Sequence, residues 1–291
     1  NDQVTRVAAY SGPTTPLHPG MRTAMLATIE HRDGILGFVI VESSKDLDVT
    51  DDNVAFLQQL TQVISNAQQR RAAEEHIRYQ ANHDELTGLP NRNLFEQRLR
   101  KAMTSSTTIR KVAIAFIDVD RFKFVNDTYG HGTGDQILQM IAMRLRSLCR
   151  PADTVARFGG DEFLVLFECS HPMDRSRFAQ RLASAFDEPF VLPDHTIHLR
   201  ASIGVANAAD IDLTLEHRVV RSGHDGEDRA TAVARRSETL IRDADTAMYE
   251  AKQQPESHIY EFDTVLRSKV VKRAQIEHNL RGAIQRNQLS L

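Results

Sequence analysis

The sequence predicts an α/β domain of packed layers over residues 83–263, because apolar strands alternate there with amphipathic helices. The stretch KVAIAFIDVDRF begins as an almost continuous apolar run, which is typical of a strand buried on both faces. The next segment, GHGTGDQILQMIAMRLRSLCR, combines a glycine loop with an apolar stripe at helical spacing. The remaining elements complete a pattern that resembles βααββαβαβ.

These later elements are expected to be, in order, a hairpin in VARFGGDEFLVLF, a helix in MDRSRFAQRLASAF, a strand in TIHLRASIGVA, a helix in SETLIRDADTAMYEAK and a short strand in SHIYEF. Between Asn207 and Glu238 the sequence is charged and has little periodicity. We therefore expect an extended loop between these two residues.

The parts before and after this domain have a different character. Residues 1–70 hold short apolar runs between turns, which predict antiparallel strands, followed by a helix that opens near Asp51. Residues 71–82 are polar almost all round except for Ile77, so this helical linker either pairs with a second copy of itself or is a solvated helix end. Residues 264–291 predict a further helix with a loose apolar seam.

The composition excludes several classes of protein. The chain has 291 residues, enough for about two domains, and its 36 basic and 39 acidic residues nearly balance. No overall field favours nucleic acid or an anionic membrane, and no apolar run reaches the roughly 18 to 20 residues of a membrane span. We expect no nucleic-acid partner and no membrane span.

The cysteines and the chain ends indicate the compartment. Cys149 and Cys169 lie far apart and have no neighbouring partner at metal spacing, so we expect packing residues in a reducing environment. The first residues lack both an initiator Met and a signal-peptide pattern, and the last residues end without a helix cap. The sequence is therefore interpreted as a cytoplasmic piece of a longer protein.

Acidic residues occur where two strands end. Asp118 follows the buried strand, and a lone Asp at such a place is usually only a cap or turn residue. Gly159 and Gly160 suit a tight hairpin, after which Asp161 and Glu162 begin the return strand. If this hairpin lies beside the first strand, one of its acids meets Asp118 across the sheet. Such acids would repel one another unless a divalent cation joined them, and their hard oxygen atoms favour Mg²⁺ or Mn²⁺.

The segment DRFKFVNDTYGHGTGD offers groups that suit a nucleotide. Lys123 supplies a positive charge for phosphate, Asn126 has both a donor and an acceptor, and Asp135 could accept hydrogen bonds from a guanine base. Its glycines allow a ligand to approach the backbone closely. The alternative is that Asp135 caps the helix it opens and that the glycines only make a turn.

Five motifs together resemble one family. HDELTGLPNR, IDVDRFKFVNDTYGHGTGD, RFGGDEF, SIGVA and RDADTAMYEAK, between about residues 82 and 262, closely resemble the GGDEF diguanylate cyclase domain in order and spacing. The resemblance implies a ferredoxin-like palm related to nucleotidyl cyclases, with an antiparallel-containing central sheet. It also implies that two molecules of GTP are condensed to cyclic di-GMP and two pyrophosphates. Each domain would hold one GTP, so turnover would need a homodimer, which the helical linker could assemble.

The resemblance assigns roles by position. Asp118 and Asp161, with the carbonyl of Val119, would hold the metal, while Glu162 would bind metal or deprotonate the 3′-hydroxyl. Asp161, Glu162 and Lys123 would form the catalytic group. The substrate-binding positions are Asn126 and Asp135 for guanine, Lys123 and Lys252 for the triphosphate, and the neighbouring Phe122 and His131.

Two departures from the family pattern bear on activity. The family usually has an Arg four residues after the position of Lys252, where this chain has Glu256, and a short loop where it has the stretch 207–238. A negative charge beside phosphates should weaken binding unless another cation substitutes. The competing hypothesis is therefore a GTP-binding regulatory domain without turnover, which controls a downstream phosphodiesterase.

Further resemblances concern regulation. Arg150 and Asp153 form an R-x-x-D that resembles the site where cyclic di-GMP inhibits its own synthesis, although the same pair could be a surface ion pair. Residues 1–70 look like the C-terminal part of a GAF sensory domain, and residues 264–291 look like the start of an EAL phosphodiesterase domain.

Overall fold

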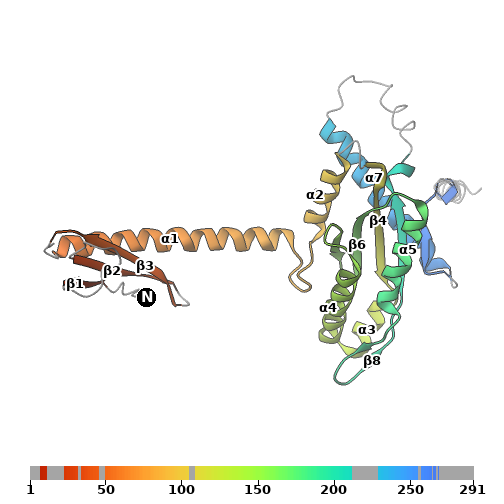
Figure 1. Cartoon of the computed structure of the whole chain (residues 1–291). Coiled ribbons are helices and arrows are strands. Elements are labelled where there is room, and N and C mark those ends of the chain that lie inside the picture. Colours follow the sequence, from red (N-terminus) through yellow and green to blue (C-terminus); the bar gives the residue numbers. More distant parts are fainter. Residues whose placement is uncertain are drawn as a thin grey trace, which may run out of the picture. The chain divides into compact units, whose positions relative to one another are not determined.

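The computed structural model describes residues 7–11, 23–31, 34–45, 50–104, 109–211, 229–254, 257–263, 265–266 and 268. The chain divides into two compact units, residues 1–79 and residues 80–291. Figure 1 shows both units, with most of the longer elements labelled. Among the described residues, no helix combines the length and the apolar character that crossing a membrane requires.

The first unit is a small antiparallel sheet with a helix on one face. Its strands pair in the order β1-β2-β3. Met25 and Ala27 of β2 pack against Leu57 of the helix in a small apolar core. The elements are β1 (Val7–Ser11), β2 (Thr23–His31), β3 (Gly34–Ser43) and α1 (Asp51–Asn82), the last of which continues into the second unit. Ile77 is exposed, in agreement with the polar character of the linker.

The second unit contains the predicted α/β layers. Its longer elements are α2 (Arg92–Met103), β4 (Val112–Val119), α3 (Phe122–Tyr129), α4 (His131–Leu148), β5 (Thr154–Gly159), β6 (Glu162–Glu168), α5 (Pro172–Ala183), β9 (Ala201–Asn207), α7 (Arg229–Gln253) and β10 (Ile259–Glu261). Short elements complete it, namely the 3-10 helices η1 (Ile109–Lys111), η2 (Ser184–Phe186) and η3 (Ala208–Asp210) and the strands β7 (Phe190–Val191) and β8 (Thr196–Ile197).

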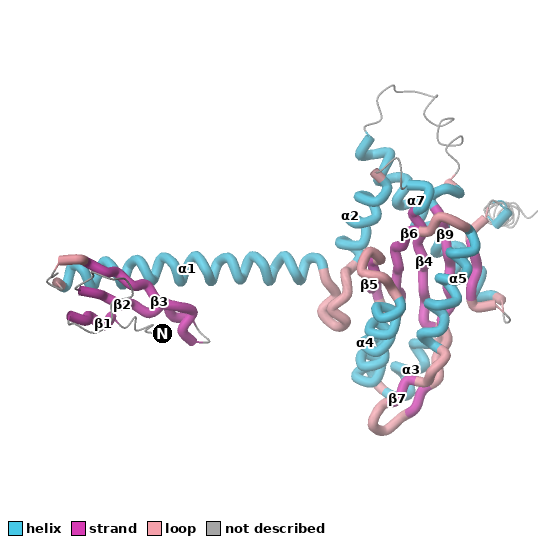
Figure 2. The backbone as a smooth tube through the Cα atoms, viewed as in Figure 1, coloured by secondary structure: helices cyan, strands magenta, loops and turns pink. Residues whose placement is uncertain are grey.

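The main sheet has five strands in the order β10-β9-β4-β6-β5 (Figure 2). Every residue of β4 is buried, which confirms the expectation from its continuous apolar run. β4 is antiparallel to both β6 and β9, whereas β10 is parallel to β9. The sheet is therefore mixed, and its central strand leads directly to the acids.

Helices cover both faces of this sheet. On one face, Ile117 and Phe163 join the core that contains residues of α3, α4 and α5. On the other face, Phe116 and Leu164 join the core that contains residues of α2 and α7. Side chains alternate along a strand, so the residue after Ile117 in β4 faces α2 and α7.

Three details differ from the expectations. The expected glycine loop is mostly the first turn of α4, which begins at His131, so Asp135 lies inside this helix and does not cap it. The segment TIHLRASIGVA does not form one strand, because β8 pairs with β7 and β9 begins anew at Ala201. The stretch expected as a loop between Asn207 and Glu238 contains the first turns of α7, which starts at Arg229. Residues 212–228, Glu256 and most of the segment 264–291 lie outside the described residues.

The cysteines are packing residues, as expected. Cys169 is buried in the core, and Cys149 packs against the same core. Both thiols are free, and burial raises the pKa of Cys149 to about 12.

Candidate functional site

The site begins with acids at one end of the central strand. In the register of the sheet, Asp118 of β4 lies opposite Glu162 of β6 and, on its other side, opposite Ser202 of β9. Directly opposed residues of antiparallel strands point to the same face. The two carboxylates therefore lie together on the face that α2 and α7 cover, which confirms the predicted meeting across the sheet.

The hairpin that carries the acids is held from two sides. Gly160 has φ +49, a conformation that suits glycine, and the amide of Val119 donates to the carbonyl of Asp161 at 3.3 Å. The guanidinium of Arg157 donates to the Gly160 carbonyl and, at 3.0 Å, to the carboxylate of Asp84. The ion pair joins the signature hairpin to the loop HDELTGLP, so two of the sequence motifs meet in space.

The carboxylates disfavour one another's ionisation. Burial and the charge of Asp118 raise the pKa of Asp161. Burial raises the pKa of Glu162 as well, and the charges of Asp118, Asp245 and Asp161 add to this effect. Several acids with raised pKa values in one place form a site that a cation would stabilise.

A lysine supplies positive charge to these acids. The ammonium of Lys252, near the end of α7, donates to Asp118 at 2.6 Å. Burial alone would lower the pKa of Lys252, but the hydrogen bond and charge of Asp118 raise it above the ordinary value. Lys252, expected beside a triphosphate, is thus placed at the acids that would hold the metal.

The residues present suit a divalent cation in chemistry. The donors are carboxylate oxygens, which Mg²⁺ and Mn²⁺ prefer. Among the residues that the structure describes, however, no group of three or more acidic, His or Cys side chains is already arranged around one metal position. Asp118 and Glu162 would hold the ion from the sheet and Asp161 from the hairpin, once Lys252 has left Asp118.

The start of α3 provides backbone donors next to the acids. Arg121 precedes the helix with φ 57 and gives it no side-chain cap. A helix start without such a cap leaves N–H groups free for an anion. Phe122 is buried and anchors this turn, while Lys123 is exposed beside it. The predicted phosphate position is therefore adjacent in the chain to the acidic end of β4.

The predicted guanine-binding residues are brought together by a glycine. A Cβ atom at Gly134 would lie 2.0 Å from Oδ1 of Asn126, so only glycine allows α3 and α4 to approach this closely. Asp135 follows it directly on α4 and is exposed, as is His131 at the start of that helix. The amide of Asn126 and the carboxylate of Asp135 thus belong to adjacent parts of two packed helices.

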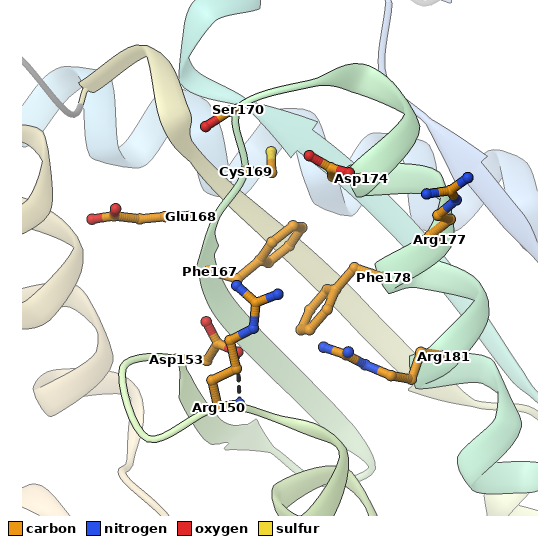
Figure 3. Close-up of a pocket in the computed structure, with 10 residues that line it drawn as sticks. All are labelled: Arg150, Asp153, Phe167, Glu168, Cys169, Ser170, Asp174, Arg177, Phe178 and Arg181. Atoms are coloured by element: carbon orange, nitrogen blue, oxygen red, sulfur yellow. Dashed lines mark hydrogen bonds between the residues drawn. The ribbon is translucent and has the colours of Figure 1, made fainter.

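The predicted product site is a cavity beside α5 (Figure 3), where Phe167 and Phe178 belong to the core on the face opposite the acids. This cavity of about 340 Å³ is lined by Arg150, Asp153, Arg177 and Arg181, among others. The Asp153 carboxylate accepts a hydrogen bond from the backbone amide of Arg150 at 2.8 Å, and the two side chains form no ion pair with each other. The Arg150 guanidinium is left to face the cavity together with that of Arg181.

Sequence reasoning missed several residues at the site. Asp245 of α7 has a pKa raised by burial and by the charge of Asp118, although its motif RDADTAMYEAK was recognised. Asp120 accepts a hydrogen bond from Ser202 at 2.8 Å. His258 lies beside Asp120 and contacts Arg200, and both residues belong to segments that were interpreted only as strands. For these residues, the sequence offered one signal of a site, the acidic Asp120 two positions after Asp118.

Comparisons with known proteins agree on one family. The family described as "Diguanylate cyclase, GGDEF domain" matches residues 81–223. The bifunctional diguanylate cyclase/cyclic di-GMP phosphodiesterase MucR of Pseudomonas aeruginosa is 37% identical over 222 residues, which are 76% of this chain and 29% of MucR. The cyclic di-GMP phosphodiesterase NbdA of the same organism is 32% identical over 75% of this chain and 25% of NbdA.

A solved structure extends the likeness to three dimensions. The GGDEF domain of TpbB from P. aeruginosa superposes with a TM-score of 0.52 at 34% identity, over 65% of this chain and 98% of that domain. The match to a nearly complete domain fixes the fold of the second unit. The chain spans less than a third of the two full-length relatives.

Proposed function

This chain belongs to the GGDEF family of diguanylate cyclase domains, and from that premise we propose that it condenses two GTP molecules into cyclic di-GMP and two pyrophosphates. In each half-reaction, the 3′-oxygen of one GTP would bond to the α-phosphorus of the other. The bond from that phosphorus to the β-phosphate oxygen would break, and pyrophosphate would leave. One proton leaves the 3′-hydroxyl for each bond formed.

The pairing of Asp118 with Glu162 is the observation that best supports this proposal. Both carboxylates face α2 and α7 at the end of β4, directly before the free N–H groups of α3. Glu162, whose pKa is raised by burial and neighbouring acids, is suited to accept the 3′-hydroxyl proton. Asn126 and Asp135 would orient the guanine.

Magnesium belongs to the same proposal. A bound Mg²⁺ would stabilise the attacking oxygen and the pyrophosphate leaving group. Asp118, Asp161, Glu162 and the Val119 carbonyl would hold it. Lys252 would move from Asp118 to the phosphates, which keeps a positive charge next to the acids both before and after the ion binds.

Incubation with GTP and Mg²⁺ tests the function. We expect cyclic di-GMP and pyrophosphate in a 1:2 ratio. Because each domain holds one GTP, the rate per chain should rise with protein concentration. Asp161→Ala and Glu162→Ala should each abolish synthesis, since each removes a group at the reacting atoms, whereas Glu188→Gln, at an exposed residue of another loop, should not. Product formation at the wild-type rate by both alanine variants would refute the assignment.

A regulatory role without turnover is the second candidate. The ion pair of Lys252 with Asp118 favours it, because the lysine blocks one carboxylate that the metal would need. The similarity to NbdA, a phosphodiesterase by name, also favours it. In this case the same assay would show GTP binding without product, and the bound GTP would control a downstream phosphodiesterase.

We also propose that cyclic di-GMP binds at Arg150 and inhibits synthesis. The arginines of the cavity could contact its phosphates, and a guanidinium can stack on a guanine base. Phe178 packs against Phe167 with ring centroids 4.2 Å apart and carries Arg181 over its ring at 4.7 Å. The position of Arg181 is thereby fixed beside Arg150.

The flanking segments complete the proposal. Residues 1–70 would be the C-terminal part of a GAF sensory domain, residues 71–82 a linker that helps two chains to pair, and residues 264–291 the start of an EAL phosphodiesterase domain. The matched relatives are much longer than this chain, and MucR by name combines cyclase and phosphodiesterase. A cytoplasmic location would suit GTP as the substrate.

A further inference from the structure

We propose that Arg200 is a substrate-binding residue that holds the β- or γ-phosphate of GTP. The inference rests on the proposed function, because it assigns a further residue to the same nucleotide. Arg200 was not among the expected site residues. It directly precedes β9, in the segment that the sequence pattern presented only as a strand.

The backbone places Arg200 at the nucleotide end of the sheet. Its carbonyl accepts a hydrogen bond of 2.9 Å from the amide of Asp120. Asp120 is followed by Arg121, after which α3 opens with its uncapped N–H groups. Arg200 is also two residues before Ser202, which lies opposite Asp118. Side chains two apart on a strand share a face, so Arg200 is on the face of the acids.

A histidine orients the Arg200 side chain. The guanidinium Nη1 lies 3.2 Å from Nε2 of His258. A guanidinium can only donate, so Nε2 of the imidazole is the acceptor in this contact. Nδ1 faces Asp120 at 3.8 Å, and Asp120 is itself held by Ser202 at 2.8 Å. The series of contacts from Ser202 through Asp120 to His258 thus positions the Arg200 side chain.

Arg200 keeps its charge available for an anion. Its side chain is exposed, and it makes no ion pair with a carboxylate among the residues that the structure describes. Other arginines of this unit are neutralised, for example Arg157 by Asp84 and Arg175 by Asp210. A histidine neighbour leaves the positive charge uncompensated, unlike a carboxylate.

The ligand that fits such a position is a polyphosphate. The α-phosphate must lie near Glu162, where the new bond would form, so the remaining phosphates extend away from it. The α3 N–H groups, Lys252 and Arg200 surround the end of β4 from three elements. An Arg can bind two phosphate oxygens at once, which a single ammonium group cannot do in the same geometry. Arg200 would also supply a positive charge to the triphosphate, for which this chain lacks the Arg that the family pattern has at the position of Glu256.

Binding of 3′-deoxy-GTP, which lacks the attacking hydroxyl and cannot react, provides the test. Calorimetric titration of the whole chain with 3′-deoxy-GTP and Mg²⁺ should give a Kd that Arg200→Gln weakens by about tenfold to a hundredfold, as expected for lost charge-assisted hydrogen bonds. Arg200→Lys should retain part of the affinity. GMP, which lacks the β- and γ-phosphates, should bind wild type and both variants equally.

The matched control is Arg110→Gln. Arg110 is an exposed arginine in η1, just before the opposite end of β4, and its replacement should leave the Kd for 3′-deoxy-GTP unchanged. Equal affinity of Arg200→Gln and wild type for 3′-deoxy-GTP would overturn the inference, and so would an equal loss of GMP binding. Failure of wild type to bind 3′-deoxy-GTP would instead overturn the proposed function and this inference with it. Thermal unfolding of each variant checks that the fold is kept.

Discussion

Glu162 shows how a single residue is held in an unfavourable state by its surroundings. Burial raises its pKa, and the charges of Asp118, Asp245 and Asp161 raise it further. The folded state therefore binds a proton more tightly than the unfolded chain does. Stability consequently falls as the pH rises from the unfolded pKa through the raised folded pKa, and at neutral pH without metal the ionised Glu162 lowers stability.

The variant Glu162→Gln should accordingly be more stable than wild type in the absence of divalent ions. We expect its Tm to rise at neutral pH, by less than the roughly 2–4 °C that 1 kcal/mol produces in a domain of this size, because Glu162 is partly exposed and water screens the repulsion. The difference should disappear at acidic pH, where wild-type Glu162 is protonated too. Thermal unfolding in EDTA across this pH range measures it, with Glu188→Gln at an exposed position as the control. A lower Tm for Glu162→Gln at neutral pH would contradict the electrostatic account.

The sequence could predict those site residues whose neighbours in the sequence form a recognisable pattern. Asp118 follows an apolar strand, and Asp161 and Glu162 follow two glycines, so both strand ends were visible. Contacts between distant segments had no such signal. Lys252 meets Asp118 across 134 positions, and Arg200 meets His258 across 58. These pairs depend on how α7 and β10 pack on the sheet, which residue patterns do not specify.

At the scale of elements, the approach of α3 to α4 decides whether the predicted guanine-binding residues meet. The side chain of Asn126 occupies the space that a Cβ atom at Gly134 would need, and the ring of Phe122 is 3.2 Å from the same point. Gly132, one half-turn earlier on α4, has open space around it. The sequence pattern does not distinguish Gly132 from Gly134, but only Gly134 lies where a side chain would clash with Asn126.

Gly134→Ala should therefore displace Asn126 and weaken GTP binding, at a cost of about 1–3 kcal/mol in stability from overpacking. Gly132→Ala should keep GTP binding and raise stability by about 0.4–1 kcal/mol, because it lowers the entropy of the unfolded chain without a clash. Denaturant unfolding and titration with 3′-deoxy-GTP measure both effects. If the two variants bind this nucleotide equally well, the glycine does not position Asn126.

The elements themselves were predictable where periodicity was strong. β4, the hairpin of β5 and β6 and the apolar part of α4 occur where the pattern placed them, but α4 begins at His131, within the expected glycine loop. The break between β8 and β9 was not visible, because both strands lie in one run of similar composition and only pairing with β7 separates them. The first turns of α7 were missed because charged residues there concealed the few apolar contacts, such as that of Val233.

At the scale of the whole molecule, the acidic end of β4 and the proposed product site occupy different sides of the second unit. The acids face α2 and α7, whereas the Arg150 cavity is lined by the end of β6 and by α5. A product bound at Arg150 therefore would not compete directly for the acids. It would instead restrain the approach of two domains to each other. Synthesis would require this approach, because each domain would hold one GTP.

Arg150→Ala should accordingly weaken inhibition by added cyclic di-GMP. We expect the inhibition constant to increase by about tenfold or more, since a charge-assisted contact with phosphate is lost from the cavity. Arg146→Ala, which removes an exposed arginine in the last turn of α4, four residues before Arg150, should leave the inhibition curve unchanged. Initial rates at several concentrations of GTP and cyclic di-GMP distinguish the two models of inhibition. Binding at the cavity gives inhibition that saturating GTP does not relieve, whereas competition at the acids gives inhibition that GTP overcomes and that Arg150→Ala leaves intact.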